Sequence, residues 1–549
     1  MKKNNSLKIR FFGGVGEVGK NMTAFEYGND IIVVDAGLSF PTEDMPGVDL
    51  LIPDTTYLEE NKHKIKGYIV THGHEDHIGA LSYVLKSANA PVFGTRLTLT
   101  LIENKLKEHN LSSVSLNAVR AGSTLKLGCF NIEFINVNHS IAGAVALAIT
   151  TPVGVLFHTG DFKIDYTPVA GEYTDLSRIA EIGKKGVLLM LSESTNVERE
   201  GYTVSETVVG ETLDKVFNAN ATKRLIIATF ASNVHRLQQI LDLAVKYKRK
   251  VAFSGRSMVS VVESAKRIGE LYVPANLIID IDKIKNYKPE QILIVSTGTQ
   301  GEPMSALTRM ATGDFNKVTI CETDTIIMSS SVIPGNEKMI YNVINNLYKK
   351  GADVLYETLE PIHVSGHACQ EELKIMLSLI KPKFFIPIHG EYRHLKKHAI
   401  LANTMGVSEN NILIPEIGST VEVTAKSLKF GENFKAGTRL VDGLEIDGSD
   451  SVVLRDRIHI SEDGIVVVVV CVDMLSGKIV STEIIGRGIT VGEDTMAEVK
   501  SILSKALDGF DLRSDDGRSA KSQIRRSMKN YVFKKTKKNP MILPIIMEV

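Results

Sequence analysis

The stretch THGHEDHIGA, which begins at Thr71, constrains this chain more than any other part of the sequence. It follows an apolar run typical of a short buried strand, and it holds three histidines and two acids within six positions. Imidazole and carboxylate groups bind zinc or manganese while leaving coordination positions open for water. His72 and His74 can converge on one ion, whereas Asp76 and His77 point elsewhere. The spacing therefore predicts two adjacent metal ions on a loop at the carboxyl end of a strand, where α/β proteins carry their chemistry.

Composition sets bounds on the rest of the chain. At roughly 100–200 residues per domain, 549 residues suggest about three domains. Lys and Arg together number 64, as do Asp and Glu, so any nucleic-acid surface must be local. The four cysteines are scattered, which favours neither a disulfide framework nor a cysteine metal site. With no apolar signal core and no membrane-length apolar run, the sequence predicts a cytoplasmic protein without a membrane segment.

Two early segments have more than one interpretation. The run from Ile31 to Asp35 is typical of a buried strand that ends in an acid. That carboxylate could orient a ligand histidine or could simply cap a turn, and the sequence does not decide between the two. The glycine-rich segment from Gly13 to Gly19 resembles a phosphate loop, but no lysine–serine ending follows it in register, so a turn between strands is favoured.

Two further candidate ligands stand where strand-like runs give way to loops. His139 ends the run from Phe134, and Asp161 ends the run from Val155; His158, inside that second run, is expected to be structural. The pair would supply a third imidazole and a carboxylate that can bridge two metals. HGHEDH, His139 and the TGD that ends at Asp161 resemble the metallo-β-lactamase fold. The resemblance implies an α/β protein with an αββα sandwich of two mixed sheets, helices outside, and metals at one edge.

The middle of the chain alternates strand-like and helical segments, which indicates a parallel sheet. The strand-like runs end in small hydroxyl and glycine residues, among them Ser232 with Asn233, Ser254 and Ser329. Exposed N–H and OH groups bind phosphate without formal charge. One such turn carries little information, but four on one sheet edge predict a surface suited to an RNA backbone.

Histidines return in HVSGHA, which begins at His363, and at His389 after another strand-like run. With Glu193, these residues look like the signature motifs of the β-CASP nucleases. The segments GEVGKN, ATFASNVHRLQQ, TGTQGEPMSAL, SSSVIPGN and PMILPIIMEV extend a close resemblance to the ribonuclease J family over nearly the whole chain. The resemblance implies a metal-dependent hydrolase that cleaves RNA.

The same resemblance implies the domain organisation. A metallo-β-lactamase domain would be split by an inserted β-CASP domain, followed by a Gly/Asp-rich linker and a small α+β domain for assembly into dimers or tetramers. The expected ranges are 1–205 and 360–425 for the split domain, 206–359 for the insert, 426–450 for the linker and 451–549 for the last domain. The basic residues near the end, such as Arg525 and Lys535, would form either a functional surface or simply a solvated helix face.

The resemblance also assigns the ligands of two divalent ions, Zn²⁺ or Mn²⁺ or both. The first ion would take His72, His74, His139 and Asp161, and the second Asp76, His77, Asp161 and His389. Asp35 would act behind a ligand histidine. His367, oriented by Glu193, would protonate the leaving 3′ oxygen, so that the products carry a 5′ phosphate. Asp49 and Asp442 match positions that hold a structural cation, Ca²⁺ or Mg²⁺, in relatives.

The expected partner is single-stranded RNA with a 5′ monophosphate, degraded from 5′ to 3′ with internal cuts in addition, in rRNA maturation and mRNA decay. A paralogue or other RNA-decay proteins would be further partners. The expected substrate-binding residues are Ser232, Asn233, His363, Val364, Ser365, Gly366 and His367. If these form a closed terminal pocket, a bulky side chain at Gly366 should impair exonuclease activity more than internal cleavage.

The sequence departs from the family pattern at two places, Ala142–Gly143 and Asp314–Phe315, which leaves loop geometry near the substrate open. Two alternatives to a ribonuclease remain. A small-ester or lactam hydrolase would use the same metals, but it needs no insert rich in phosphate-binding turns. A non-catalytic RNA-binding scaffold would not need a complete ligand set.

Overall fold

The computed structural model describes residues 6–42, 44–302, 304–333, 336–357, 359–443, 445–448, 452–473, 478–490, 495–507 and 518–548. The chain forms two compact units: Met1–Ser39 with Ile52–Thr438, and Phe40–Leu51 with Arg439–Val549. Among the described residues, no helix has the length and apolar character needed to cross a membrane.

The first unit contains a sandwich of two mixed sheets. One has the order β20-β19-β1-β2-β3-β5-β6-β7 and the other β18-β12-β11-β10-β9-β8. The strands of the first are β1 (Leu7–Gly13), β2 (Met22–Tyr27), β3 (Asp30–Val34), β5 (Ile65–Ile69), β6 (Val92–Gly94), β7 (Leu116–Ala118), β19 (Thr420–Val423) and β20 (Leu428–Phe430). Those of the second are β8 (Thr124–Leu127), β9 (Phe130–Asn136), β10 (Val145–Thr151), β11 (Gly154–His158), β12 (Leu189–Glu193) and β18 (Phe384–Ile388).

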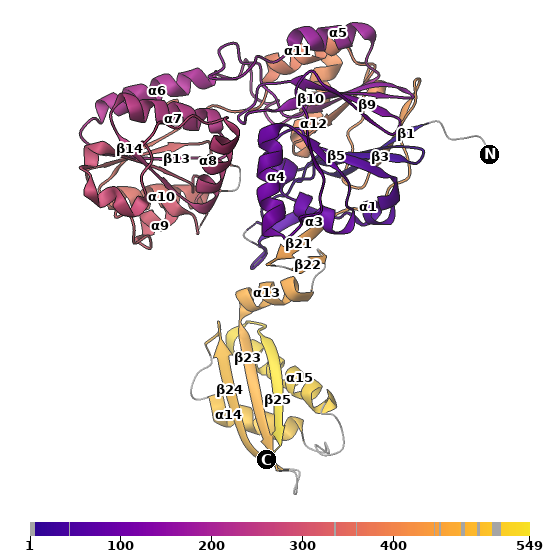
Figure 1. Cartoon of the computed structure of the whole chain (residues 1–549). Helices are drawn as coiled ribbons and strands as arrows, with labels where there is room; N and C mark the ends of the chain where they lie inside the picture. The colour runs from indigo at the N-terminus through magenta and orange to yellow at the C-terminus, as the bar shows by residue number, and fades with distance from the viewer. Residues whose placement is uncertain are drawn as a thin grey trace, which may run out of the picture. The chain divides into compact units, whose positions relative to one another are not determined.

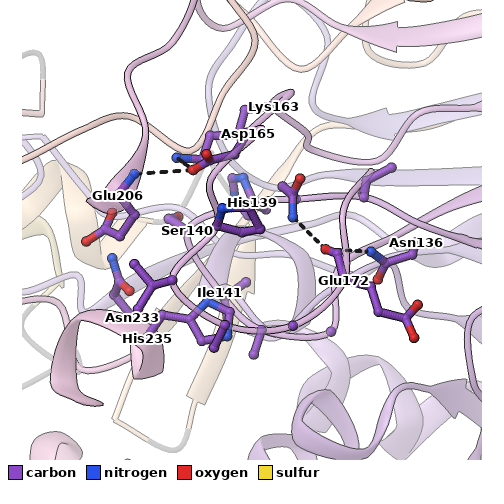
Figure 2. Close-up of a pocket in the computed structure, with 18 of the residues that line it drawn as sticks. Asn136, His139, Ser140, Ile141, Lys163, Asp165, Glu172, Glu206, Asn233 and His235 are labelled. Carbon is purple, nitrogen blue, oxygen red and sulfur yellow. Dashed lines mark hydrogen bonds and ion pairs between the residues drawn. The ribbon is translucent and has the colours of Figure 1, made fainter. Parts of the chain in front are cut away.

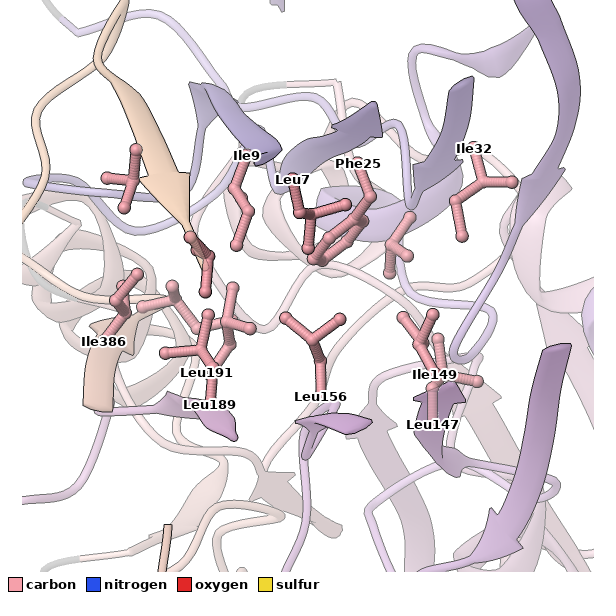
Figure 3. Packing of buried hydrophobic residues seen from close by; sticks show 14 of the residues in the cluster. Leu7, Ile9, Phe25, Ile32, Leu147, Ile149, Leu156, Leu189, Leu191 and Ile386 are labelled. Carbon is pink, nitrogen blue, oxygen red and sulfur yellow. The ribbon is translucent and has the colours of Figure 1, made fainter. Parts of the chain in front are cut away.

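Apolar side chains from the facing sides of these sheets interlock to form the sandwich core (Figure 3). Ile9 and Phe25 of the first sheet, for example, pack in one cluster with Leu147 and Leu189 of the second. Because successive strand residues face opposite sides, the next residues along the second sheet join a separate outer core under helices. The αββα architecture implied by the sequence resemblance is therefore present.

Helices cover both outer faces of the sandwich (Figure 1). Those next to the first sheet are α1 (Thr56–Glu60), α2 (Glu75–Ile78), α3 (Leu81–Ser87) and α4 (Arg96–Glu108). Those next to the second sheet are α5 (Leu176–Lys185), α11 (Gln370–Ile380) and α12 (Tyr392–Thr404).

An inserted domain separates β12 from β18 in the sequence. In the second sheet these two strands are parallel neighbours, and Glu193 pairs with Ile388. The parallel sheet of the inserted domain has the order β14-β15-β13-β16-β17. The strands are β13 (Arg224–Thr229), β14 (Lys250–Ser254), β15 (Ile292–Ser296), β16 (Asp324–Ser329) and β17 (Asp353–Tyr356), and the helices α6 (Glu206–Ala219), α7 (Val234–Lys246), α8 (Arg256–Ile268), α9 (Ala306–Thr312) and α10 (Glu337–Lys349). α6 and α7 cover one face and α9 and α10 the other (Figure 1).

The stretch expected as a linker, residues 426–450, contains strands. β20 belongs to the first unit, and β21 (Thr438–Asp442) and β22 (Glu445–Gly448) join β4 (Leu50–Pro53) in a small sheet. Gly443, with a positive φ of 59°, lies in the turn between β21 and β22.

The last sheet, β24-β23-β25, consists of β23 (Ile465–Val472), β24 (Ile479–Arg487) and β25 (Met541–Glu548), flanked in sequence by α13 (Val452–Asp463), α14 (Thr495–Ala506) and α15 (Arg518–Thr536). The expectation of a buried strand at β23 is correct for one face only, because burial alternates along it. Val466 and Val468 pack with Val499 and Ile524 of the helices, whereas the alternate residues are partly open. The basic run lies on helix α15, where Lys535 pairs with Glu498 at 2.9 Å.

Candidate metal centre

The ligand candidates lie just beyond the carboxyl ends of strands in both sheets of the sandwich. The loop after β5 carries the first histidines, those after β9 and β11 carry His139 and Asp161, and β18 leads directly into His389. The local fold is specific: His389 adopts a positive φ of 52° and Asp35, after β3, one of 61°. Left-handed backbone is uncommon in residues other than glycine and concentrates at functional sites. Strand ends thus bring together residues more than 300 positions apart.

Three histidines form one candidate ligand group. The His74 Nδ1 atom lies 3.1 Å from Nε2 of His72 and 3.1 Å from Nε2 of His139. His72 Nε2 also lies 3.6 Å from Oδ2 of Asp161. Ligand atoms about 2.0–2.1 Å from one tetrahedral zinc ion are separated by about 3.3 Å. The three histidines therefore have the spacing of a zinc site, and Asp161 lies next to His72.

The second group contains Asp76, His77, Asp161 and His389. His77 Nε2 lies 3.4 Å from Oδ2 of Asp76 and 3.2 Å from Oδ2 of Asp161. His389 Nε2 lies 3.1 Å from Oδ2 of Asp76, and its Nδ1 lies 3.2 Å from Oδ1 of Asp161. These are the residues that the sequence resemblance assigns to a second metal.

Asp161 belongs to the second group, and its Oδ2 atom also lies 3.6 Å from Nε2 of His72 and 3.9 Å from Nε2 of His139 in the first. Its position therefore fits a bridging ligand. The side chain is only 3 % exposed, and Oδ2 accepts no hydrogen bond of good geometry, although Nε2 of His77 lies 3.2 Å away. A buried carboxylate is costly unless cations compensate its charge. Divalent ions bound between the two groups would satisfy this atom, so the residues present fit the metals that the fold implies.

The electrostatics of the two groups differ. Burial and neighbouring imidazoles hold the pKa values of His72 and His139 well below the usual range. Burial lowers the pKa of His74 to about 4. These rings are therefore neutral and offer lone pairs to a metal. Burial also lowers the pKa of His389, but the carboxylates of Asp161 and Asp76 outweigh it and raise the value to about 10. The carboxylates thus create a field that favours positive charge at the second group.

Asp35 lies behind the second group, where it orients His77. Its Oδ2 atom lies 2.8 Å from Nδ1 of His77, and its Oδ1 accepts a hydrogen bond from the Thr71 N–H at 2.8 Å. Such contacts fix the ring of a ligand histidine and its tautomer. Asn21, which sequence reasoning missed, donates from Nδ2 to the Asp76 carbonyl at 3.1 Å. Its place in the GEVGKN motif could have identified Asn21 as a residue of the site.

His367 and Glu193 form a separate pair beside the candidate metal ligands. His367 Nδ1 lies 3.0 Å from Oε2 of Glu193 and 3.9 Å from Oδ2 of Asp161. Burial lowers the pKa of His367, but the Glu193 carboxylate outweighs burial and raises it above the usual value. With Nδ1 held by Glu193, Nε2 is the nitrogen that can transfer a proton. By contrast, His158 is structural in its contacts: its Nδ1 accepts from the Gly160 N–H at 3.1 Å.

The topology of the inserted sheet predicts a ligand-binding crevice at the carboxyl ends of β13 and β16. The chain leaves β13 toward β14 on one side and leaves β16 toward β17 on the other, and α/β sheets bind ligands where such connections diverge. Ser232 and Asn233 follow β13, and Ser331 follows β16 with its Oγ 3.2 Å from Nε2 of His363. The Asn233 side-chain oxygen already caps α7, because it accepts a hydrogen bond from the Arg236 N–H.

Two expected substrate residues have other contacts. Gly366 lies against the ligand His139, whose Nδ1 is 2.7 Å from its carbonyl oxygen. A Cβ atom at Gly366 would lie 2.7 Å from the His139 ring and from Oγ of Ser140. A bulky residue there would displace a metal ligand, so the expected selective effect on exonuclease activity is not supported by this geometry. Ser365 Oγ accepts from Nδ2 of Asn196 at 2.8 Å, and Val364 is buried.

A cavity of about 260 Å³ opens beside the metal centre, and His139 and Asn233 are among its lining residues (Figure 2). Ala142 and Gly143, the first departure from the family pattern, also line it. The Gly143 carbonyl accepts from Thr95 Oγ1 at 2.8 Å, and Gly143 has a positive φ of 77°. This departure therefore does lie beside the metal centre.

The other departure and the candidate cation site lie elsewhere. Phe315 packs against the core of the inserted domain, in the connection that follows α9 and precedes the start of β16, at the opposite edge of the sheet from the crevice. In the second unit, Asp49 Oδ2 accepts from the Gly443 N–H at 2.7 Å and Asp442 Oδ2 binds Arg457 at 2.6 Å. Neither aspartate joins a group of three or more potential ligands within the described ranges.

Comparisons with known proteins agree with these features. Family models match residues 15–165 (metallo-beta-lactamase superfamily), 222–347 (ribonuclease J, beta-CASP domain), 351–415 (Zn-dependent metallo-hydrolase RNA specificity domain) and 452–549 (ribonuclease J C-terminal domain). The chain is 41% identical to ribonuclease J of Synechocystis, covering 99% of this chain and 87% of the relative. It is 39% identical to ribonuclease J2 of Bacillus subtilis over the whole of both chains.

Ribonuclease J of Thermus thermophilus is 40% identical, with 99% of this chain and 95% of that protein covered. A crystal structure of a protein of unknown function from Enterococcus faecalis V583 shares the fold, with a TM-score of 0.54 at 16% identity over 76% of this chain and 100% of that one. Identity near 40% over essentially full length is decisive for family membership: this chain belongs to the ribonuclease J family.

Proposed function

We propose that this protein is a two-metal ribonuclease that removes nucleotides from the 5′ end of single-stranded RNA and also cuts internally. The observation that carries the proposal is the position of the buried Asp161 Oδ2 atom, 3.2 Å from Nε2 of His77 in one ligand group and 3.6 Å from Nε2 of His72 in the other. The crevice of the inserted domain offers a row of hydrogen-bond donors for a phosphodiester chain. A small-ester hydrolase would not need these donors.

Divalent ions bound there, Zn²⁺ or Mn²⁺, would lower the pKa of a water molecule and neutralise charge on the scissile phosphate. His72, His74, His139 and Asp161 would hold one ion, and Asp76, His77, Asp161 and His389 the other. Among the ligand carboxylates, Asp161 is placed to touch both.

The remaining chemistry is assigned to the chain's own side chains. Glu193 accepts from Nδ1 of His367 and keeps the ring protonated, so its Nε2–H can pass a proton to the departing 3′ oxygen. Proton transfer at that oxygen gives the released nucleotide a 3′ hydroxyl and leaves the scissile phosphate on the 5′ end of the remaining RNA. The loop from His363 to His367 joins the crevice to this proton donor, and it would place a terminal phosphate one nucleotide from the metals.

The proposal is tested with RNA labelled at its 5′ end, in the presence and absence of a chelator. We expect 5′-labelled mononucleotides to appear first, faster from 5′-monophosphate RNA than from 5′-triphosphate RNA, and no cleavage after chelation. Neutral donors in a space of fixed size should accept one phosphate and exclude a triphosphate. Stepwise shortening of fragments that keep the 5′ label would contradict the direction, and hydrolysis of small esters instead of RNA would contradict the substrate.

The assembly proposal is a homodimer or tetramer formed through the C-terminal domain. In β25 the alternate residues Leu543, Ile545 and Met547 are 44%, 39% and 49% exposed, while the other face of the sheet packs on α14 and α15. An open apolar stripe of this kind marks an association surface. Leu543→Lys should shift the protein to smaller species in light scattering after size exclusion. An unchanged mass would show that association uses another surface.

The cellular role proposed from family membership is rRNA maturation and mRNA decay in the cytoplasm, with a paralogue or other RNA-decay proteins as partners. Depleting the protein should extend the lifetimes of 5′-monophosphorylated transcripts and leave rRNA precursors with unprocessed 5′ ends, both measurable by sequencing of RNA ends. A cation at Asp49 and Asp442 is not part of the proposal, because Arg457 already neutralises Asp442.

A further inference from the structure

Arg236, on α7, is a fully buried cation for which the proposed reaction gives no role. Its Nε and Nη2 atoms donate to the two carboxylate oxygens of Glu206 at 2.6 and 2.9 Å. Its Nη1 donates to the Ser329 carbonyl at 2.8 Å and to Nδ1 of His363 at 3.0 Å. The guanidinium therefore connects the start of α6, the end of β16 and the HVSGHA loop.

The contact with His363 determines where that ring carries its proton. A guanidinium has five N–H donors and no acceptor, so the Nδ1 that faces it must present a lone pair. A neutral imidazole with an accepting Nδ1 carries its hydrogen on Nε2. Burial and the charges of Arg236, Arg199 and Lys163 hold the pKa of His363 well below its usual range, which keeps the ring neutral.

The Nε2–H of His363 faces the crevice. It lies 3.2 Å from Oγ of Ser331, and the Ser329 hydroxyl donates to the Ile362 carbonyl at 2.6 Å, which fixes the backbone just before the ring. An N–H and a hydroxyl together form a neutral donor pair for a phosphate oxygen. Glu206 neutralises the guanidinium, so the crevice gains an oriented donor instead of a free charge.

Building on the proposed function, we infer that Arg236 is a positioning residue that locks His363 in its Nε2–H tautomer and so aims this donor at the 5′ phosphate of the RNA. The same contact anchors one end of the loop whose other end carries His367. Arg236 touches no reacting atom in this arrangement, and its effect on the reaction passes through His363.

The first test measures the tautomer directly. In full-length protein labelled with ¹⁵N-histidine and loaded with zinc, the resonances of His363, assigned with H363Q, should show hydrogen on Nε2 and none on Nδ1. A nucleoside 5′-monophosphate should shift the Nε2–H resonance. Hydrogen on Nδ1, or a cationic ring at neutral pH, would overturn the inference. This NMR measurement does not depend on cleavage. If the wild-type protein degrades no RNA, the ribonuclease proposal fails, but the tautomer of His363 can still be determined.

The second test removes the clamp without leaving a buried charge. R236M alone would strand the Glu206 carboxylate and could unfold the domain, so R236M is combined with E206Q. We expect the dissociation constant of the nucleoside 5′-monophosphate and the KM for 5′-monophosphorylated RNA to rise about 10- to 100-fold, the usual range for losing the partner of a functional histidine. The kcat, internal cleavage and metal content should stay near wild type.

R249M is the matched control. Arg249 is also buried in the inserted domain, but it donates to backbone carbonyls such as those of Lys223 and Ile292, near the opposite edge of the sheet. It should lower thermal stability and leave KM unchanged. If the R236M/E206Q protein binds the nucleotide as tightly as R249M does, Arg236 has a structural role only and the inference is wrong. R236K, which keeps charge but not the fork, should bind more weakly than wild type.

Discussion

The metal centre and the crevice both lie at the carboxyl edges of sheets, yet they use opposite kinds of side chain. The metal centre gathers carboxylates and imidazoles around the buried Oδ2 atom of Asp161. The crevice offers hydroxyls, backbone groups and a neutral His363, and its buried cation Arg236 is already paired with Glu206. In the proposed function, cations would complete the first edge and the second would bind an anion with weak, neutral donors. Single substitutions should therefore have large effects at the first edge and small ones at the second.

The largest effect is expected from Asp76→Ala. Asp76 Oδ2 lies within 3.4 Å of Nε2 of both His77 and His389, so its loss removes a ligand from the second group. Its side chain is 31 % exposed, and no core is opened. We expect cleavage to fall at least about 100-fold, beyond the usual effect of outer contacts, with an unchanged unfolding temperature. Glu75→Ala is the control, because Glu75 pairs with Lys105 on the surface. Activity within tenfold of wild type would contradict the two-metal assignment.

Gly366→Val should remove exonuclease and internal cleavage together. The added side chain would meet the His139 ring at 2.7 Å, which displaces a ligand of the first group. Elemental analysis should show less bound metal, and assays on linear and circular RNA should lose activity in parallel. Retention of full metal content with selective loss of attack at the 5′ end would restore the terminal-pocket interpretation of Gly366.

His367→Ala should slow chemistry without emptying the metal centre. The ring is held by Glu193 at 3.0 Å and lies at the border of the two groups, so its assigned role is proton transfer. Loss of a general acid costs on the order of 10²–10⁴ in rate. Single-turnover cleavage with metal analysis checks this prediction, and Glu193→Gln should give a smaller loss in the same direction. A missing metal in the His367 variant would make the residue a ligand instead.

The sequence predicted the metal edge better than the crevice, and the reason is the range of the interactions. HGHEDH places four ligands within six residues, and strand ends carry the others to the same edge. The Arg236 contact joins helix α7 to a loop 127 positions later, and the Gly366 contact with His139 spans 227 positions. Nothing in local composition indicates which of two distant residues faces the other, so neither contact was predicted.

The C-terminal unit gives a similar lesson about strands. A run of five valines after Ile465 looks fully buried as sequence, because apolar residues occupy both faces. Only packing shows that helices cover one face of β23 and leave the other partly open. Apolar character on the uncovered face then becomes evidence for association instead of for a core.

The smallest effect is expected from Ser331→Ala, and it tests the crevice side of the comparison. The hydroxyl lies 3.2 Å from Nε2 of His363, and a neutral hydrogen bond contributes about 0.5–1.5 kcal/mol. We therefore expect kcat/KM on 5′-monophosphorylated RNA to fall by about 2- to 12-fold, with internal cleavage and metal content unchanged. Ser257→Ala, at an exposed position of α8, is the control. A loss as large as that of Asp76→Ala would mean that the crevice depends on one strong contact, and the distinction drawn between the two edges would fail.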